Sequence, residues 1–179
     1  MIQIPYPMAI ALITALWIIC RMVISTKNGS VNWKREAQLL LVYICLVVVI
    51  RLTFFPFGKV DGKVQPLLFD PSNIYPFNLN FKAITNLMDF ESRQEALFNL
   101  FGNIFLLMPL GIIFPILDKR LNTPLKAITA GIAISLTIEI FQLPFFQRVT
   151  DINDLILNSA GYIAGYLICL MIKKAKKKA

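Results

Sequence analysis

The stretch EIFQLPFFQRVTDINDLILNSAGYIAG, residues 139–165, decides the fold, because it carries ionisable and amide side chains in the most apolar part of the chain. Asp151, Asp154 and Asn158 follow one another at steps of three and four, so they share one face of a helix. Glu139 lies upstream in an apolar run. Ionisable groups at membrane depth are costly, so they usually face a helix bundle or a wet cavity and often mark function. We therefore expect this stretch to build a polar site between helices.

The composition is that of an integral membrane protein. Of the 179 residues, 57% are hydrophobic and 16% are charged, with a mean hydropathy of +0.67, whereas soluble domains carry about 25% charged residues. Apolar runs near the roughly 20 residues that a spanning helix needs recur along the chain. We predict an all-α fold, a polytopic bundle of about five transmembrane helices that forms a single membrane domain over residues 1–179. The expected spans are 5–25, 36–57, 92–117, 125–143 and 154–172.

Local signals mark the ends of these spans. Ser92 and Glu95 have the spacing of a capping box, which starts the third span. Thr123 followed by Pro124 is typical of an N-cap and a first helical position, so the fourth span begins here, and Pro144 stops it.

Other residues predict how the spans pack. Pro109 and Pro115 lie inside the third span and are expected to kink or shorten it. Gly161 and Gly165 give the fifth span a small-xxx-small face, which suits close contact within the chain or in a homo-oligomer. The aromatic-rich connection 58–93 is expected to lie in the membrane interface or to fold back over the bundle; a flexible loop is the alternative.

The basic residues predict the orientation. The net charge is +8, and five of the 18 basic residues lie in the Lys-rich tail 173–179. Such a cluster after a spanning helix is typical of a cytoplasmic anchor that also contacts anionic lipid, and we favour it over nucleic-acid binding. Placing the tail inside puts eleven basic residues inside and five outside, with Arg21 and Arg51 within spans, and Arg21 is expected to snorkel to the interface. The bias predicts an N-out, C-in protein.

The residue types exclude several kinds of site. The chain has no His, which rules out a Ser-His-Asp triad, a Cys-His pair and a His-ligated metal. Cys20, Cys45 and Cys169 lie inside apolar runs and are expected to behave as small hydrophobic residues. No disulfide framework, metal site or cofactor is expected.

The polar residues of the different spans fall in one layer. At 1.5 Å of rise per residue, those within spans lie roughly 6 to 12 Å beneath the outer surface, and the inner half of the expected bundle shows no comparable set. Scattered structural residues would not be expected to collect in this way, so we predict a ligand-binding site or polar network. Its members are Arg51, Asn99, Asn103, Glu139, Gln142, Arg148, Asp151, Asp154 and Asn158.

The acidic residues each allow two roles. Glu139 with Gln142 suits an acid–amide pair that binds a head group, a proton or a cation, although both residue types also hydrogen-bond between helices as structural contacts. Asp151 sits where an N-cap of the fifth span is expected, with Asp154 at the third helical position. Glu139, Asp151 and Asp154 are also the candidate catalytic residues and the oxygen ligands that a divalent cation would need.

The remaining members are expected to pair or to orient charges. Arg51 or Arg148 is placed to neutralise Glu139 or Asp154, because buried charges need partners; alternatively, an arginine at the outer rim grips phosphate or carboxylate. The asparagines are expected to be network members that hold the charged groups in position.

Taken together, these motifs resemble the VanZ-like family of bacterial membrane proteins over about residues 42–166. The matching residues, in chain order, are Arg51, Thr53 and Pro56; Asn73, Ile74, Tyr75, Pro76 and Phe77; Asn99 and Asn103; Pro109, Leu110 and Gly111; Glu139 and Gln142; Arg148, Asp151, Asp154, Asn158, Gly161 and Gly165. The resemblance implies a multi-pass protein of the bacterial cytoplasmic membrane, and the family's namesake is associated with teicoplanin resistance. The extra N-terminal transmembrane helix at 5–25 lies outside the resembling region.

The resemblance leads to three hypotheses for function. The first is a cell-envelope protein that lowers susceptibility to teicoplanin and related lipoglycopeptide antibiotics, with a lipid-linked cell-wall intermediate or the lipoglycopeptide itself as candidate ligand. The second is an intramembrane enzyme acting on a lipid phosphate or a peptide, although no nucleophile motif supports it. The third is a proton- or ion-coupled transporter, for which an intramembrane Glu139 is typical, but neither an inverted repeat nor a polar path through the inner half is evident.

Overall fold

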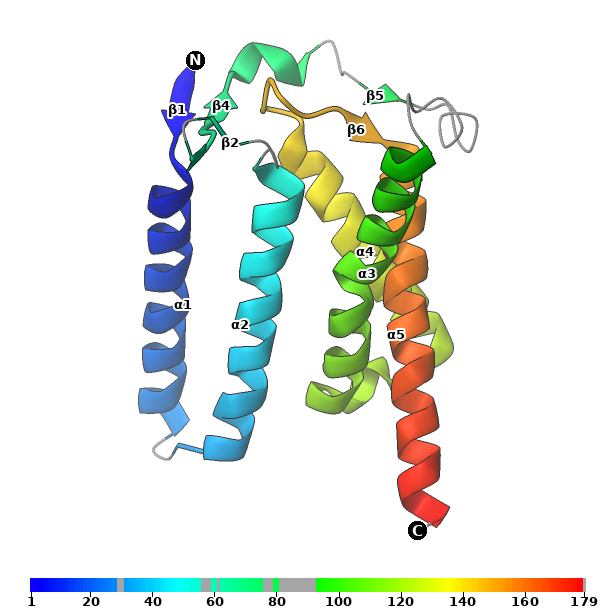
Figure 1. Cartoon of the computed structure of the whole chain (residues 1–179). Coiled ribbons are helices and arrows are strands. Elements are labelled where there is room, and N and C mark those ends of the chain that lie inside the picture. Colours follow the sequence, from blue (N-terminus) through cyan, green and yellow to red (C-terminus); the bar gives the residue numbers. More distant parts are fainter. Residues whose placement is uncertain (29–30, 56–58, 61, 76–78, 81–92, 179) are drawn as a thin grey trace. The chain divides into compact units, whose positions relative to one another are not determined.

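The computed structural model describes residues 1–28, 31–55, 59–60, 62–75, 79–80 and 93–178 (Figure 1). In this part of the chain, five helices are long enough and apolar enough to cross a membrane, which confirms the expected all-α class and the number of spans. The helices are α1 (Tyr6–Asn28), α2 (Trp33–Phe54), α3 (Arg93–Leu117), α4 (Pro124–Gln142) and α5 (Ile152–Lys178).

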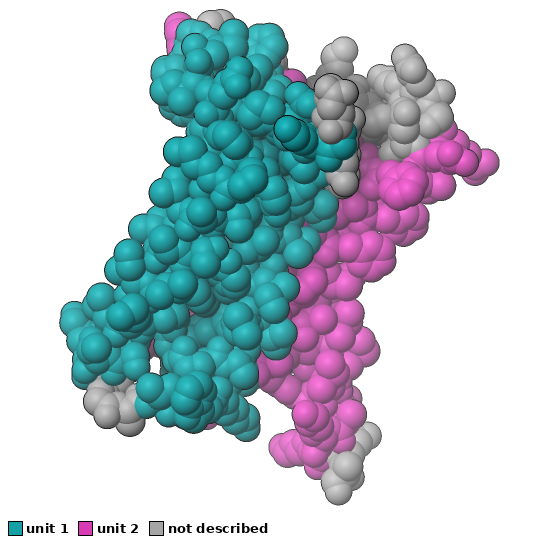
Figure 2. Space-filling model, turned by 60° about the vertical axis from the view of Figure 1, so that its left-hand side comes forward, with its two compact units in different colours: residues 1–73, 144–148 teal, residues 74–143, 149–179 magenta. Residues whose placement is uncertain are grey.

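The chain divides into two compact units, coloured separately in Figure 2. Unit 1 contains α1, α2 and the short segment between α4 and α5. Unit 2 contains α3, α4 and α5. The residue ranges are Met1–Asn73 with Pro144–Arg148 for unit 1, and Ile74–Leu143 with Val149–Ala179 for unit 2.

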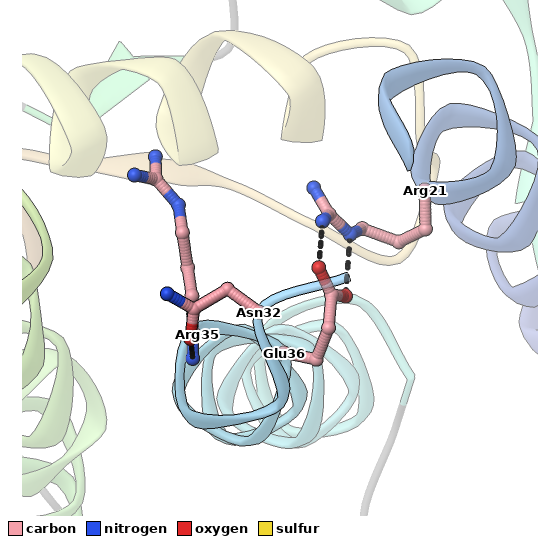
Figure 3. A network of polar contacts seen from close by, with 4 residues as sticks. All are labelled: Arg21, Asn32, Arg35 and Glu36. Atoms are coloured by element: carbon pink, nitrogen blue, oxygen red, sulfur yellow. Dashed lines mark hydrogen bonds and ion pairs between the residues drawn. The ribbon is translucent and has the colours of Figure 1, made fainter. Parts of the chain in front are cut away.

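Polar contacts join the two helices of unit 1. Thr14 on α1 donates its hydroxyl hydrogen to the Ile10 carbonyl (2.7 Å), so Tyr43 on α2 is the donor in the 2.6 Å contact between the Thr14 and Tyr43 hydroxyls. Nearer the turn, the Arg21 guanidinium forms a two-pronged ion pair with the Glu36 carboxylate (Figure 3). Its planar fork matches a carboxylate on the neighbouring helix, and the snorkelling of Arg21 to the interface stays a prediction. Two helices with apolar outer surfaces are thus held together by directional contacts.

A small sheet caps unit 1 at the other end of α1. The N-terminal strand β1 (Ile2–Ile4) pairs antiparallel with β4 (Leu67–Phe69). The segment before α5 joins this sheet: Phe145 bridges Phe69, and the Gln147 side chain accepts from the Leu68 N–H (2.9 Å) and donates to the Pro66 carbonyl (3.0 Å). Gln147 therefore pairs with one backbone group of β4 and with the carbonyl of the residue before the strand.

Only parts of the 58–93 connection lie within the described residues. They include the hairpin of β2 (Lys59–Val60) and β3 (Lys63–Val64) and the 3₁₀ turn η1 (Pro71–Ile74). Just before η1, the Asp70 carboxylate accepts from the Ser72 hydroxyl (2.6 Å) and N–H (3.0 Å), and these hydrogen bonds lower the pKa of Asp70.

In unit 2, α3 and α5 lie side by side and α4 packs on α5 (Figure 1). A Cβ added to Gly161 would lie 1.9 Å from the Ile104 carbonyl oxygen, and one added to Gly165 would lie 2.0 Å from that of Met108. From the first contact to the second, the residue number rises by four on both helices, so α3 and α5 run parallel. Gly111 on α3 completes the contact, because its Cβ would lie 2.0 Å from the carbonyl oxygen of residue 162. The Gly161/Gly165 face is thus used inside the chain.

Short elements close the two ends of unit 2. At one end, β5 (Leu79–Asn80) pairs in parallel with β6 (Thr150–Asp151), directly before α5; we call this the β6 end. At the other end, the 3₁₀ turn η3 (Lys119–Asn122) connects α3 to α4; we call this the η3 end. Unit 2 has hydrogen-bonded polar side chains at both of these ends.

The predicted ends of α4 hold, whereas α2 begins three residues before its expected span and α5 continues to Lys178, six residues beyond its expected end. Pro124 occupies the first position of α4, with Thr123 as an N-cap residue whose side chain makes no capping hydrogen bond. α4 ends at Gln142, before Pro144, and α3 continues past Pro109 and Pro115 to Leu117. The proposed capping box of α3 lies outside the described residues.

Candidate functional site

The first part of the site links α3 to α5 at the β6 end. Asn103 on α3 donates from its amide nitrogen to the Asp154 carboxylate (2.6 Å) and to the Asn99 side-chain oxygen (3.0 Å). Asn99 and Asn103 share a helix face because they are four residues apart. The amide pair thus holds one carboxylate oxygen of Asp154 in a fixed position in the first turn of α5.

The second part is centred on Glu139, in the last turn of α4. Its side chain is only 2% exposed, and its Oε2 accepts from the backbone N–H of Asp151 (3.1 Å). The Glu139 carbonyl also accepts from the Thr150 hydroxyl (3.0 Å). The carboxylate and the backbone carbonyl of Glu139 therefore both bind the segment that leads into α5. The carboxylates of Asp154 and Asp151 lie within electrostatic range of Glu139, so three acidic residues gather at this end of unit 2.

Asp151 has a structural role in this arrangement. Its carboxylate accepts from the N–H of Asn153 (2.8 Å), the second residue of α5, which is an N-cap hydrogen bond. Asp154 then occupies the third position of the helix, as the spacing predicted. The carboxylates of both residues lie at the positive end of the α5 dipole, where acidic side chains stabilise a helix.

Two further predicted members are buried in unit 2. Gln142 on α4 is 6% exposed, and Asn158 on α5 is 1% exposed. Among the described residues, the Asn158 Oδ1 atom has no hydrogen-bond partner. A buried acceptor without a partner is uncommon in proteins.

The two predicted arginines, Arg51 and Arg148, both belong to unit 1. Arg51 donates to the Phe55 carbonyl (3.0 Å) and its guanidinium lies over the Tyr6 ring, 5.7 Å from the centroid. Arg148 donates to the Phe54 carbonyl (3.1 Å). The two side chains thus bind neighbouring carbonyls at the end of α2. Their pairing with the acidic residues of unit 2 remains a prediction.

Sequence reasoning missed several buried polar residues of unit 2, among them Ser135 and Tyr162. Ser135 lies one turn from Glu139 on α4, is fully buried and donates to the Leu155 carbonyl (3.2 Å). Tyr162 lies one turn from Asn158 on α5, is fully buried, and its hydroxyl has no hydrogen-bond partner in the described part of the chain. The spacing of four from a recognised polar residue was the available signal in both cases.

The metal-site alternative gains no support from the geometry. Within the described ranges, no group of three or more His, Cys, Asp or Glu side chains is arranged to hold a metal ion. One acceptor position of Asp151 is already used by the α5 cap and one of Glu139 by the Asp151 N–H. The cluster is better described as a hydrogen-bonded acid–amide network than as a ligand shell.

The described part of the chain has five helices of membrane-spanning length and a partly buried acid–amide network in unit 2, which together define a multi-pass membrane protein. A family model described as VanZ/LLP1 matches residues 40–173, and the chain belongs to this family, as the motifs predicted. The match begins inside α2 and leaves α1 outside. Comparisons with curated proteins and with solved structures found no match.

Proposed function

We propose that this protein is a cell-envelope protein of the VanZ type that lowers susceptibility to teicoplanin and other lipoglycopeptide antibiotics. The observation that carries the proposal is Glu139, a carboxylate 2% exposed on a spanning helix and joined to the start of α5. A structural contact between helices can be made by an amide, without the cost of an ionisable group in the membrane. An acid at this position is therefore better explained by ligand binding.

The proposed orientation follows from the charges. With the N-terminus outside and the C-terminus inside, most Lys and Arg residues face the cytoplasm, including those of the tail 173–179. This orientation puts the β6 end of unit 2 beneath the outer surface of the bacterial cytoplasmic membrane. We treat the whole chain, residues 1–179, as one membrane domain.

The proposed ligand is a lipid-like molecule at the outer leaflet. A lipid-linked cell-wall intermediate and the lipid-anchored antibiotic both place polar groups at the depth of the Glu139 network. In this proposal Asn99, Asn103 and Asp154 position the binding groups, and Glu139 contacts the ligand. Arg51 and Arg148 of unit 1 stay candidate ligands for a phosphate or carboxylate by themselves. The hydrophobic part of the ligand lies among the lipid chains.

The test is antibiotic susceptibility of a sensitive Gram-positive host that expresses the protein. The proposal predicts protection against teicoplanin and none against vancomycin, which lacks a membrane-anchoring lipid tail. Glu139→Gln and Asp154→Asn should each remove the protection at matched membrane levels. Asp118→Asn is the matched control, because Asp118 is exposed at the start of η3 and its amide can still accept from the Arg120 N–H.

Two results would contradict the proposal. Equal protection against both antibiotics would mean that the lipid tail is irrelevant. Full teicoplanin protection by both site variants would mean that the acid–amide network is a structural contact only.

A further inference from the structure

Polar side chains continue along α5 beyond the candidate site. Asp154, Asn158, Tyr162 and Tyr166 follow one another at steps of four, so they form one slowly winding stripe on the helix. The last three are almost completely buried, at 1%, 0% and 2% exposed. The sequence suggested no polar set beyond the outer layer; the structure shows one, carried by tyrosine hydroxyls. Buried polar groups therefore extend along the interior of unit 2 from the β6 end to the η3 end.

Both ends of this stripe are hydrogen-bonded. At the β6 end, Asp154 accepts from Asn103. At the η3 end, the Tyr166 hydroxyl donates to the Asn122 carbonyl (2.7 Å), and the Lys173 ammonium contacts the Asn122 side-chain oxygen and donates to the Pro115 carbonyl (3.0 Å). At each end, the polar side chains of the stripe are thus hydrogen-bonded directly to neighbouring residues.

The middle of the stripe is different. Asn158 Oδ1 and the Tyr162 hydroxyl are both inaccessible and have no hydrogen-bond partner among the residues that the structure describes. Leaving a buried donor or acceptor unpaired is costly because the group has lost its hydrogen bonds to water. The two groups belong to residues one helical turn apart, and a buried water typically binds two to four groups of this kind.

The surrounding residues suit water. Gly131 on α4 leaves room for the Tyr162 ring, whose nearest atoms would lie 3.0–3.1 Å from a Cβ at that position. Ser135, also on α4, gives its hydrogen to the Leu155 carbonyl and keeps lone pairs for a further donor. Tyr162 can donate and accept, whereas the Asn158 oxygen only accepts. Together they offer the mixed set of partners that a water molecule uses.

We propose that water held by Asn158 and Tyr162 completes a proton path through unit 2, from Glu139 at the β6 end to the Tyr166–Asn122 pair at the η3 end. Each water or hydroxyl on the path accepts one proton and releases another, so it returns to its starting form. The Glu139 carboxylate takes up or releases the proton at its end. No other bond forms or breaks, and no electron moves.

The path is tested by proton flux into liposomes that contain the purified full-length chain and a pH-sensitive dye, with a potassium-valinomycin potential as driving force. Wild-type protein should acidify the lumen several-fold faster than protein-free liposomes. Tyr162→Phe should reduce the rate to that of protein-free liposomes, because it removes the hydroxyl but keeps the ring. Tyr43→Phe is the matched control: it deletes a hydroxyl that contacts Thr14 in unit 1, and it should keep the wild-type rate.

A second measurement uses the wild-type protein alone, so it does not depend on how a variant folds. In water-edited solid-state NMR of bilayer samples with labelled tyrosine, Tyr162 should receive magnetisation from water although it is fully buried, while Tyr43 should receive little. No transfer to Tyr162 would overturn the proposal, as would wild-type flux equal to that of protein-free liposomes or a Tyr162→Phe variant as fast as wild type. Neither assay contains an antibiotic, so their failure leaves the proposed function untouched.

Discussion

The contact between α3 and α5 makes a sharp prediction for Gly161→Ala. The new Cβ would lie 1.9 Å from the Ile104 carbonyl oxygen, whereas an ordinary contact begins at 3.4 Å. The clash is with backbone rather than with a flexible side chain, so one helix must move by more than an ångström. Overpacking of this kind costs about 1–3 kcal/mol.

Gly102→Ala is the control within the same helix pair. A Cβ at Gly102 meets nothing within 4 Å, and alanine is the better helix former, so this variant should be neutral or gain up to about 1 kcal/mol. The two alanine variants should therefore differ by about 1–4 kcal/mol, which corresponds to a difference in melting temperature of roughly 2–16 °C.

The assay uses the buried thiol of α5. In a background with Cys20 and Cys45 replaced by alanine, Cys169 is the only thiol of the chain and is 1% exposed, so a thiol-reactive dye reports when unit 2 opens on heating. Equal melting temperatures for Gly161→Ala and Gly102→Ala would refute the close helix contact.

Three further predictions concern stability. Asp151→Ala should cost about 1 kcal/mol in the thiol assay because the α5 cap is lost, whereas Asp151→Asn, which keeps an acceptor, should stay close to wild type; equal losses would contradict the cap. Arg21→Leu should destabilise unit 1 by roughly 1–3 kcal/mol, measured by tryptophan fluorescence on heating, and exchanging Arg21 and Glu36 should recover most of it; no recovery would argue against the ion pair. Lys173→Met should cost about 1–2 kcal/mol in the thiol assay through lost hydrogen bonds at the η3 end, whereas Lys174→Met should have no effect, since Lys174 is exposed.

Much of the fold was predictable because the bilayer imposes a length on each helix. Apolar runs bounded by Pro124, Pro144 and the polar turns located all five helices, but the end of α5 was missed because the helix continues through the charged tail to Lys178. The pairing of β1 with β4 was not predictable, because it joins positions more than sixty residues apart through three-residue strands. Gln147 was missed for the same reason: its side-chain contacts are with the distant residues 66 and 68.

The site was predictable to the extent that it is carried by charged and amide side chains. Spacing alone placed Asp154 on the face that Asn103 contacts, and Asp151 before α5. Tyr162 and Tyr166 were not predicted, because a tyrosine in an apolar run is interpreted as a large hydrophobic residue. Only burial shows that their hydroxyl groups lie inside the unit, where a partner matters.

The most direct test of the central claim is the teicoplanin susceptibility of cells that express Glu139→Gln, compared with cells that express wild type at the same membrane level. The substitution keeps the size of the side chain and an acceptor for the Asp151 N–H, so the fold should persist and the thiol melting temperature should change little. The account predicts that the variant loses teicoplanin protection while it remains folded. A folded Glu139→Gln variant that protects as well as wild type would contradict the claim that this carboxylate is the functional group of the site.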